Sequence, residues 1–395
     1  MTYRSPTSDL GFLYAMELFS GLSRGSYLVC IGWTTLIVTD DVARVGQVFI
    51  VAMLTGLLGG PLIGTLVDRH NRKVLVIAAH LGIAVTLGLL GTLWLGQSSP
   101  SVSALFIAVA VSTALRLTHN SSHDGLLQAL VDKPDLIRTV ARFRGLHLVA
   151  TVLGTVLAGG IIERLSPQAG FLFSALCSLA VIVPMLFVKG GRIAKGARGV
   201  MAFLSDVNGG VRIFVTNRRV RLLALLAAVS LPVGQLSNAI LSSFIRDDLG
   251  RGSEAFGIVD AAWPLGGMLA AGLLSFGHHR LAARNSEYLF AFLAGAATIG
   301  MAFSTSLPAL VLFHAAMGLT VWLCRIVIDG RVLEVSAEEN VGRTKVGIEM
   351  MFSLSALIMC LSPTLVALPS TAGYFLYWGV AMVGVSVLIW VRARV

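Results

Sequence analysis

The sequence is poor in charged residues and in cysteine. Of its 395 residues, 13% are charged and four are cysteines, and no two cysteines stand close enough in sequence to form a zinc-binding pair. Neither a disulfide framework nor a metal site is therefore expected. The four lie inside apolar runs, where we expect them to pack as small residues: Cys30, Cys177, Cys324 and Cys360.

Motifs that drive or catalyse reactions are also missing. The chain has no phosphate-binding G-x-x-x-x-G-K-[ST] segment and no H-E-x-x-H zinc-protease motif, and it shows no nucleophile elbow of a hydrolase. These absences argue against ATP-driven pumping and against hydrolysis. We expect a protein that is not an enzyme and that uses no cofactor.

Apolar residues dominate the composition. They make up 56% of the chain, and the mean hydropathy is +0.83. A bilayer core about 30 Å thick needs roughly 20 apolar residues per helical crossing, and runs of this kind recur along the chain. The pattern predicts an all-α polytopic membrane protein with 12 transmembrane helices. The expected spans lie near 11–38, 43–67, 73–95, 102–122, 140–163, 168–188, 221–245, 254–277, 287–305, 308–328, 346–367 and 372–391.

The formal net charge of +10 suggests either nucleic acid or a membrane as the partner, and the positions of the basic residues decide between them. If the N-terminus is cytoplasmic, most Lys and Arg residues fall in inner loops. This distribution indicates membrane topology and argues against nucleic acid. We expect a multi-pass protein of the inner (cytoplasmic) membrane with both termini in the cytoplasm. The few basic residues in outer loops are Arg44, Arg164, Arg246 and Arg251.

The longest polar stretch, residues 189–219, divides the chain into two halves. It contains the basic, Gly-rich segment KGGRIAKGARG, which is typical of a linker. We therefore expect an N-terminal six-helix bundle over 1–188, a cytoplasmic linker over 189–219 and a C-terminal six-helix bundle over 220–395. Sparse matches between the halves, such as Arg69 with Arg280, favour a duplication. Transporters that work by rocking of two bundles are built from such parallel repeats.

The segment GTLVDRHNRK, residues 64–73, is the most informative motif and follows the second expected span. Gly64 and Asp68 are four residues apart and share one helical face. A neighbouring helix is expected to come close there, one turn before a carboxylate at the membrane surface. A basic cluster then places the loop on the inner side. Its members are Arg69, Arg72 and Lys73.

This segment resembles the inner-loop signature G-x-x-x-D-R-x-x-R-K of the major facilitator superfamily, with Asn71 in place of the family's usual glycine. The resemblance covers nearly the whole chain and implies two six-helix bundles around a central cavity that opens to each side in turn. It also implies that Asp68, with Arg69 and Arg72 as its charge network, braces one bundle against the other. The corresponding loop of the second half carries His279 where that aspartate would stand.

Finer features are similar to the enterobactin-exporter and drug-efflux side of that superfamily. The fifth expected span contains GTVLAGG, residues 154–160, which is similar to a glycine-rich antiporter motif but lacks its proline. Ordinary close packing of helices through small residues is the alternative explanation of this segment. The segment therefore favours an exporter without establishing one.

Ionisable residues inside the expected spans are few. Each costs roughly 2.5–3.5 kcal/mol at mid-span unless it faces a cavity or a partner, so each is a candidate for function. Glu17 and Arg24 lie nearly on one helical face, and we expect both to face the central cavity. Arg325 and Asp329 are one turn apart, so a salt bridge within the helix is the favoured interpretation there. The candidates for substrate binding or proton coupling are Glu17, Arg24, Arg116, Asp260, Arg325 and Asp329.

Two further features bear on the site. Asp260 lies close to Trp263 and Pro264, where a break in the helix would open the backbone towards a cavity. Three histidines also fall within spans, but no two have metal-ligand spacing, so we expect lone histidines in the core. They are His80, His147 and His314.

These features together predict a secondary transporter. In the preferred interpretation, Glu17 or Asp260 takes up a proton, and its release is coupled to export of a small amphipathic molecule. Three embedded arginines favour an anionic or metal-chelating cargo such as a siderophore, with multidrug efflux as the alternative cargo class. Uptake is the alternative direction, and a transport-inactive sensor or assembly partner is the alternative class of protein. We expect a monomer whose partners are the bilayer, protons and a small molecule.

Overall fold

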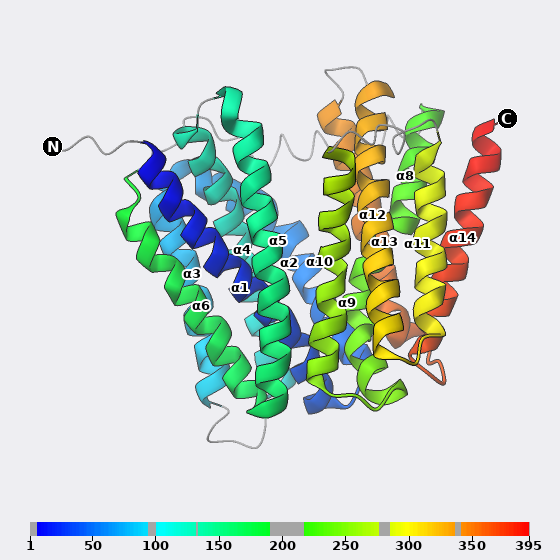
Figure 1. Ribbon diagram of the computed structural model, residues 1–395, viewed down its shortest axis with the longest axis horizontal. Coiled ribbons are helices and arrows are strands. Elements are labelled where there is room, and N and C mark those ends of the chain that lie inside the picture. The colour runs from blue at the N-terminus through cyan, green and yellow to red at the C-terminus, as the bar shows by residue number, and fades with distance from the viewer. Residues whose placement is uncertain are drawn as a thin grey trace. The chain divides into compact units, whose positions relative to one another are not determined.

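The computed structural model describes residues 6–93, 100–131, 133–189, 217–275, 285–335 and 341–394. Within these ranges the chain forms long helices joined by short connections, and it forms no strand (Figure 1). The predicted all-α membrane fold is confirmed.

Six helices precede the polar stretch, and two of them begin at capping residues that are visible in the sequence. Ser101 and Ser166 cap two of them, because each side-chain oxygen accepts a hydrogen bond from a backbone N–H of the first turn, at 3.2 Å in both cases. Pro167 follows Ser166 at a position where its missing N–H is not needed. The helices are α1 (Pro6–Thr39), α2 (Val42–Arg69), α3 (Arg72–Leu93), α4 (Val102–Leu130), α5 (Lys133–Arg164) and α6 (Pro167–Phe187).

The second half has the same general plan, but its first span is interrupted. The span predicted over 221–245 consists of three pieces, because Pro232 lacks an N–H and ends the first helix, and a π-helical segment follows the second. The pieces are α8 (Arg218–Ser230), α9 (Val233–Ser243) and η2 (Phe244–Asp248). The remaining helices are α10 (Ser253–Ser275), α11 (Ser286–Ala302), α12 (Leu307–Val335), α13 (Val341–Leu365) and α14 (Ala372–Arg394).

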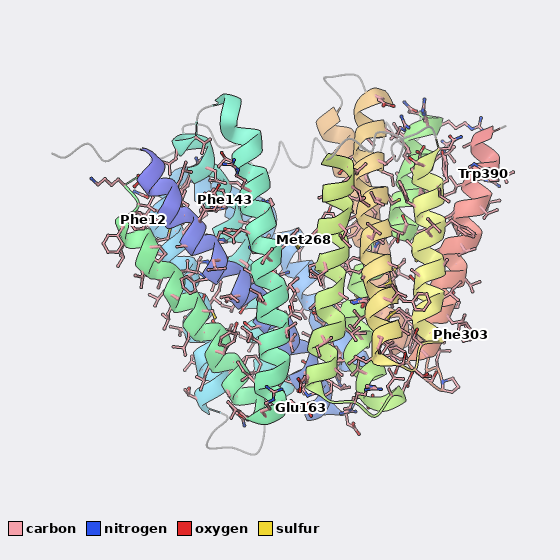
Figure 2. All side chains as sticks on the ribbon, in the orientation of Figure 1. Phe12, Phe143, Glu163, Met268, Phe303 and Trp390 are labelled. Atoms are coloured by element: carbon pink, nitrogen blue, oxygen red, sulfur yellow. The ribbon has the colours of Figure 1, made fainter. Side chains whose placement is uncertain are left out.

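The helices are long and apolar enough to cross a bilayer. In the described part of the chain, 10 helical segments meet both criteria, and α11 is a shorter apolar helix. Helix α1, with 34 residues, is long enough to span but carries more polar residues. Large apolar side chains project outward along the helices (Figure 2). On α6, Leu176, Val183 and Leu186 are 63%, 59% and 60% exposed and form a lipid-facing stripe.

The chain divides into two compact units. Unit 1 comprises Met1–Asp40 and Val51–Val200, and unit 2 comprises Asp41–Ile50 and Met201–Val395, so the first turns of α2 are grouped with unit 2. In unit 1, α1 packs against α5, and α3 packs against α4 and α6. In unit 2, α8 packs against α13, and α11 packs against α12 and α14. The same pairings in the same order are the arrangement expected of two repeats.

Glycines allow α1 and α5 to approach closely. A Cβ atom added at Gly25 would collide with the backbone of Thr151, and one added at Gly154 would collide with the backbone of Leu22. Gly154 belongs to the segment GTVLAGG, so at this position the segment packs directly against α1. This contact fixes the spacing of the two helices that carry Glu17 and its nearest partner.

Gly154→Ala is expected to destabilise unit 1, because the new methyl group meets backbone that cannot move aside. Overpacking of this kind costs about 1–3 kcal/mol. Gly145→Ala on the same helix is the matched control, since its Cβ would meet no atom within 4 Å. Thermal unfolding of both purified variants in one detergent tests the prediction, and equal unfolding temperatures for the two would show that the α1–α5 contact is not close.

Candidate functional site

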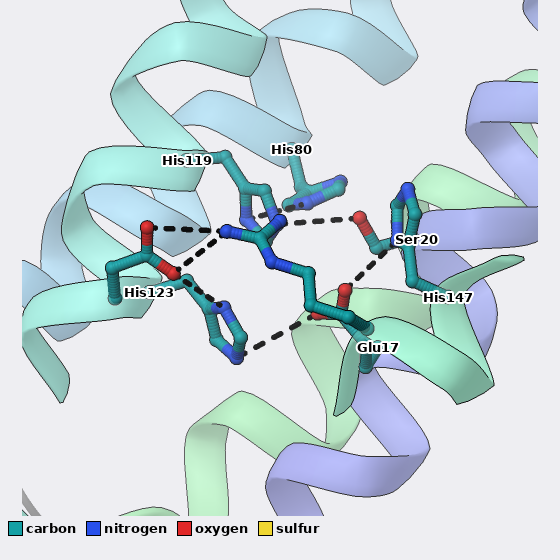
Figure 3. A network of polar contacts seen from close by, with 8 residues as sticks. Glu17, Ser20, His80, His119, His123 and His147 are labelled. Atoms are coloured by element: carbon teal, nitrogen blue, oxygen red, sulfur yellow. Dashed lines mark hydrogen bonds and ion pairs between the residues drawn. The ribbon is translucent and has the colours of Figure 1, made fainter. Parts of the chain in front are cut away.

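Glu17 lies on α1 in the interior of unit 1 and is held between two imidazoles (Figure 3). Its Oε1 atom is 2.8 Å from Nδ1 of His147 on α5, and its Oε2 atom is 3.6 Å from Nε2 of His123 on α4. The Glu17 side chain is only 3% exposed. A carboxylate buried this deeply is costly unless it is paired or protonated, and imidazole partners permit either state. The arrangement can therefore bind and release a proton.

The second nitrogen of His123 leads towards the surface. Its Nδ1 atom is 3.8 Å from Oδ1 of Asp124, and the Asp124 side chain is 48% exposed. Arg144 on α5 contacts both oxygens of Asp124, at 3.2 and 3.3 Å. His123 thus stands between a buried carboxylate and an exposed one.

A second pair of histidines adjoins this group, and its hydrogen bonds run in one direction. Ser178 donates its hydroxyl to the backbone carbonyl of His80 at 3.2 Å, so the same oxygen accepts from Nδ1–H of His80 at 2.9 Å. Nε2 of His80 then accepts from Nδ1–H of His119 at 3.1 Å, and Nε2 of His119 accepts from the hydroxyl of Ser20 at 3.3 Å. These tautomers follow from the network, and they leave both rings neutral with both nitrogens occupied.

Two arginines lie near this group: Arg24 further along α1, and Arg116 on α4. Arg116 is 6% exposed, donates to the carbonyl of Ser23 at 3.1 Å, and lies over the ring of Tyr27 at 4.7 Å. Arg24 is partly buried, and its charge acts on both Arg116 and Tyr27. Arg24 forms no ion pair or hydrogen bond with the residues that the structure describes. The pair is therefore a centre of positive charge to which no acidic side chain of the described residues is bound.

The sequence was expected to contain no nucleophile elbow, but the segment GLSRG, residues 21–25, has the G-x-S-x-G spacing of one, with Ser23 at its centre. Ser23 lies in the middle of α1 and not at a turn between a strand and a helix, and its carbonyl accepts hydrogen bonds from Arg116 and Ser174. The match therefore has none of the structure that a hydrolase needs.

Arg325 on α12 differs from the other two arginines because acids neutralise it. It forms the predicted pair with Asp329 at 3.6 Å and a closer one with Glu349 on α13 at 2.9 Å. These side chains are also substantially exposed, Arg325 at 35%. Arg325 and Asp329 therefore lend no support to an anionic cargo, although Arg325 was one of the three arginines from which such a cargo was predicted.

Asp260 lies on α10 and is partly buried. It forms no hydrogen bond or ion pair with any described residue, so it stays a second candidate for proton binding. The expected helix break beside it is wrong: α10 continues through Pro264 to Ser275. The residue before Asp260, Val259, is contacted by His314, whose Nδ1 lies 2.6 Å from the carbonyl oxygen of Val259.

The basic residues of the loop motif fasten the start of α3 inside unit 1. Arg72 donates to the carbonyl of Gly125 on α4 at 2.6 Å. Lys73 donates to the carbonyls of Leu186 and Val188 at the end of α6, at 2.8 and 2.6 Å, where a cation complements the helix dipole. Asn71 accepts from the backbone N–H of Lys73 at 3.0 Å, so it caps α3.

The rest of the loop motif gives a mixed result. Within unit 1, a Cβ at Gly64 would meet no described atom within 4 Å, and the close helix contact at Gly64 stays a prediction. Arg69 is exposed at the end of α2. The side chain of Asp68 and the second copy of the loop around His279 lie outside what the structure describes, so the bracing role of Asp68 stays a prediction.

The histidine group was not predicted from the sequence. The expectation of lone histidines is wrong for His80 and His147, and His119 and His123 were not among the expected site residues. These two are four residues apart on α4 and stack at 5.7 Å between ring centroids. That spacing was the available signal, because it places both rings on one helical face. Among the described residues, no group of three or more His, Cys, Asp or Glu is arranged to hold a metal ion.

Comparison with known proteins shows the family. A sequence profile described as the Major Facilitator Superfamily matches residues 13–237. The chain is similar in structure to the nucleoside transporter NupG, with a TM-score of 0.80 and 14% identity over 98% of this chain and 99% of that one. It is also similar to a mutant of the peptide transporter POT, with a TM-score of 0.74 and 15% identity over 100% of this chain and 99% of that one. No curated protein sequence matches the chain.

Identities this low establish a shared fold and say nothing of a shared cargo. The profile, in contrast, extends over more than half of the chain, from α1 into α9. The chain therefore belongs to the Major Facilitator Superfamily, whose members are membrane transporters and not enzymes.

Proposed function

We propose that the chain is a proton-coupled secondary transporter of small amphipathic organic anions that works by alternating access. The observation that carries the proposal is the composition of α1. This helix places a buried carboxylate, Glu17, between two imidazoles, and two turns further on it places Arg24 beside Arg116. One helix thus supplies a group that can exchange a proton and a group that can bind an anion.

The case for an anionic cargo rests on charge balance. A charged side chain inside a membrane protein is costly unless it is paired or faces water, and Arg24 has no acidic partner among the described residues. A carboxylate, phosphate or catecholate group on the cargo would supply the missing partner. Tyr27 is buried beneath Arg116 and holds the charge of Arg116 in place, and an amphipathic anion such as a siderophore would supply the partner that Arg24 lacks.

For the direction of transport we propose export by proton antiport from the inner membrane. The support is the resemblance to exporters of the enterobactin and drug-efflux type, in which a glycine-rich segment of the fifth span is prominent. Here that segment contacts α1 at Leu22, between Glu17 and Arg24. In the same proposal both termini are cytoplasmic, and the bundles comprise 1–188 and 220–395. Most of the linker proposed over 189–219 lies outside the described residues.

Uptake with a proton is the second candidate, and electrostatics favours it. Glu17 and Arg24 are separated by seven residues, or about 10 Å of helix. Charges of opposite sign on one helix attract each other. An anion bound at Arg24 cancels its positive charge, so the anion and a proton on Glu17 favour each other. Binding of both together is what a symporter requires.

A transport panel tests the cargo class. Purified protein in liposomes is offered aromatic carboxylates, quaternary ammonium compounds and neutral amides of matched size, with a pH-sensitive dye inside. We expect flux and a coupled change of internal pH with the carboxylates alone, and the sign of that change separates antiport from symport. Flux of the ammonium compounds alone would overturn the anionic assignment, and binding without flux would indicate a sensor.

A further inference from the structure

We propose that His123 transfers the proton between Glu17 and Asp124, so that this imidazole is the route by which the buried carboxylate exchanges protons with the aqueous surface. The inference rests on the proposed function, because it takes Glu17 as the proton-binding group. It adds a path and a residue to that function.

The geometry of His123 suits transfer because its two nitrogens face two different carboxylates. Nε2 is 3.6 Å from Glu17, whose side chain is 3% exposed, and Nδ1 is 3.8 Å from Asp124, whose side chain is 48% exposed. Both separations exceed a hydrogen bond, so a small movement of the side chains precedes each transfer. One ring therefore lies between a buried carboxylate and an exposed one.

The transfer needs no other reactant. The O–H bond of protonated Glu17 breaks as an N–H bond forms at Nε2 of His123. The N–H bond at Nδ1 then breaks as an O–H bond forms at Asp124, which passes its proton to water. The ring is then left as the Nε2–H tautomer, and transfer in the opposite direction returns it to the starting Nδ1–H tautomer. Inward transfer follows the same steps in reverse.

The neighbouring histidines do not offer an onward path. His119 stacks on His123, but its two nitrogens are already engaged by Ser20 and His80. The chain of bonds beyond it ends at Ser178, whose hydrogen is donated to a backbone carbonyl. A proton that entered this branch would stop there. His119 and His80 therefore position the cluster and keep the transfer on the side of Asp124.

His147 is the competing exit. Its Nδ1 is closer to Glu17, at 2.8 Å, and its side chain is 24% exposed. No carboxylate among the described residues receives a proton from its other nitrogen, in contrast to His123. We therefore assign His147 as the fixed partner that sets how tightly Glu17 holds its proton.

The titratable and charged groups around Glu17 come from four helices. They are His147 and Arg144 on α5, His119, His123 and Asp124 on α4, His80 on α3, and Arg24 on α1. Helix α6 contributes the hydroxyls of Ser174 and Ser178.

A pH-jump experiment without any cargo tests this assignment. Purified protein in nanodiscs is followed by time-resolved infrared spectroscopy at the carboxylic acid stretch, and Glu17→Gln identifies the band of Glu17. Because proton-transfer residues contribute about 100-fold or more, we expect His123→Asn to slow loss of this band by about 100-fold. His147→Asn should instead shift the pH at which the band appears, with little change in rate.

Asp124→Asn provides a second arm that is insensitive to folding of the core, because Asp124 lies at the surface. We expect slow proton release that acetate in the buffer restores, since a soluble carboxylate can replace an exposed acceptor but cannot repair a structural defect. His314→Asn in unit 2 is the control for loss of a buried histidine, whose nitrogens contact Ser237 and the carbonyl of Val259. It should leave the rate unchanged.

The outcomes separate this inference from the proposed function. If no band of the wild-type protein disappears in Glu17→Gln, Glu17 does not bind the proton and the proposed function fails. If the band is present but His123→Asn and Asp124→Asn release the proton at the wild-type rate, the route fails and the function stands. Slow release in His147→Asn alone would assign the exit to His147.

Discussion

Replacement of Glu17 by glutamine is expected to abolish accumulation of cargo against its gradient while leaving exchange of cargo intact. Glutamine preserves the size of the side chain and can still contact His147 and His123, but it cannot bind and release a proton. Alternating access of the loaded carrier should persist, and only the coupling should be lost. Uptake of a radiolabelled aromatic carboxylate under an imposed pH gradient, compared with counterflow at equal pH, measures the two activities separately.

The matched control for this variant is Glu349→Gln. Glu349 is also a carboxylate paired with a basic group on another helix, but it is 53% exposed and its partner is Arg325. We expect its gradient-driven transport to match that of the wild type. Full accumulation in Glu17→Gln would contradict the assignment and would direct attention to Asp260, the other carboxylate that the sequence singled out for proton binding.

Replacement of Arg24 by glutamine is expected to weaken cargo binding by about tenfold to 100-fold, because a hydrogen bond to a charged group contributes about 1.5–3 kcal/mol. Arg24→Lys should retain more affinity than glutamine does, since it keeps the charge but loses the planar pair of donors. Affinity for the best carboxylate from the transport panel, measured by calorimetry on purified protein, checks the prediction.

Arg325→Gln is the control for loss of an arginine from a membrane helix. Its charge is balanced by Asp329 and Glu349, so its removal should leave affinity for the anion unchanged. Equal losses in the Arg24 and Arg325 variants would indicate a general effect of positive charge on the anion and not a binding contact. Normal affinity in Arg24→Gln would remove this residue from the site.

The fold was predictable because its signal is local. Each crossing requires a long apolar run, and the runs near 72–93 or 167–187 are bounded by polar residues and caps that are visible in the sequence. The interruption of the seventh span at Pro232 was missed, since apolar content continues through it. The opposite error was made at Pro264, where α10 continues as a helix. Proline alone does not decide whether neighbouring helices support the backbone.

The site was only partly predictable, because it depends on partners that are distant in sequence. The high cost of charge in a membrane directed attention to Glu17 and Arg24, but not to the imidazoles that surround Glu17. The neutralisation of Arg325 by Glu349 depends on how α12 packs against α13, which no spacing reveals. His119 and His123 were also missed, although the sequence contained a signal for them: their separation of four residues places both on one face of a helix.

The direct test of the central claim is a measurement of proton movement during cargo transport by wild-type and Glu17→Gln protein. Liposomes containing each protein and an internal pH-sensitive dye receive an aromatic carboxylate with no initial pH gradient. The account predicts that internal pH changes with cargo flux in the wild type and stays constant in Glu17→Gln, although cargo still exchanges. The same pH change in both proteins, or cargo flux without any pH change in the wild type, would show that Glu17 does not carry the coupling proton.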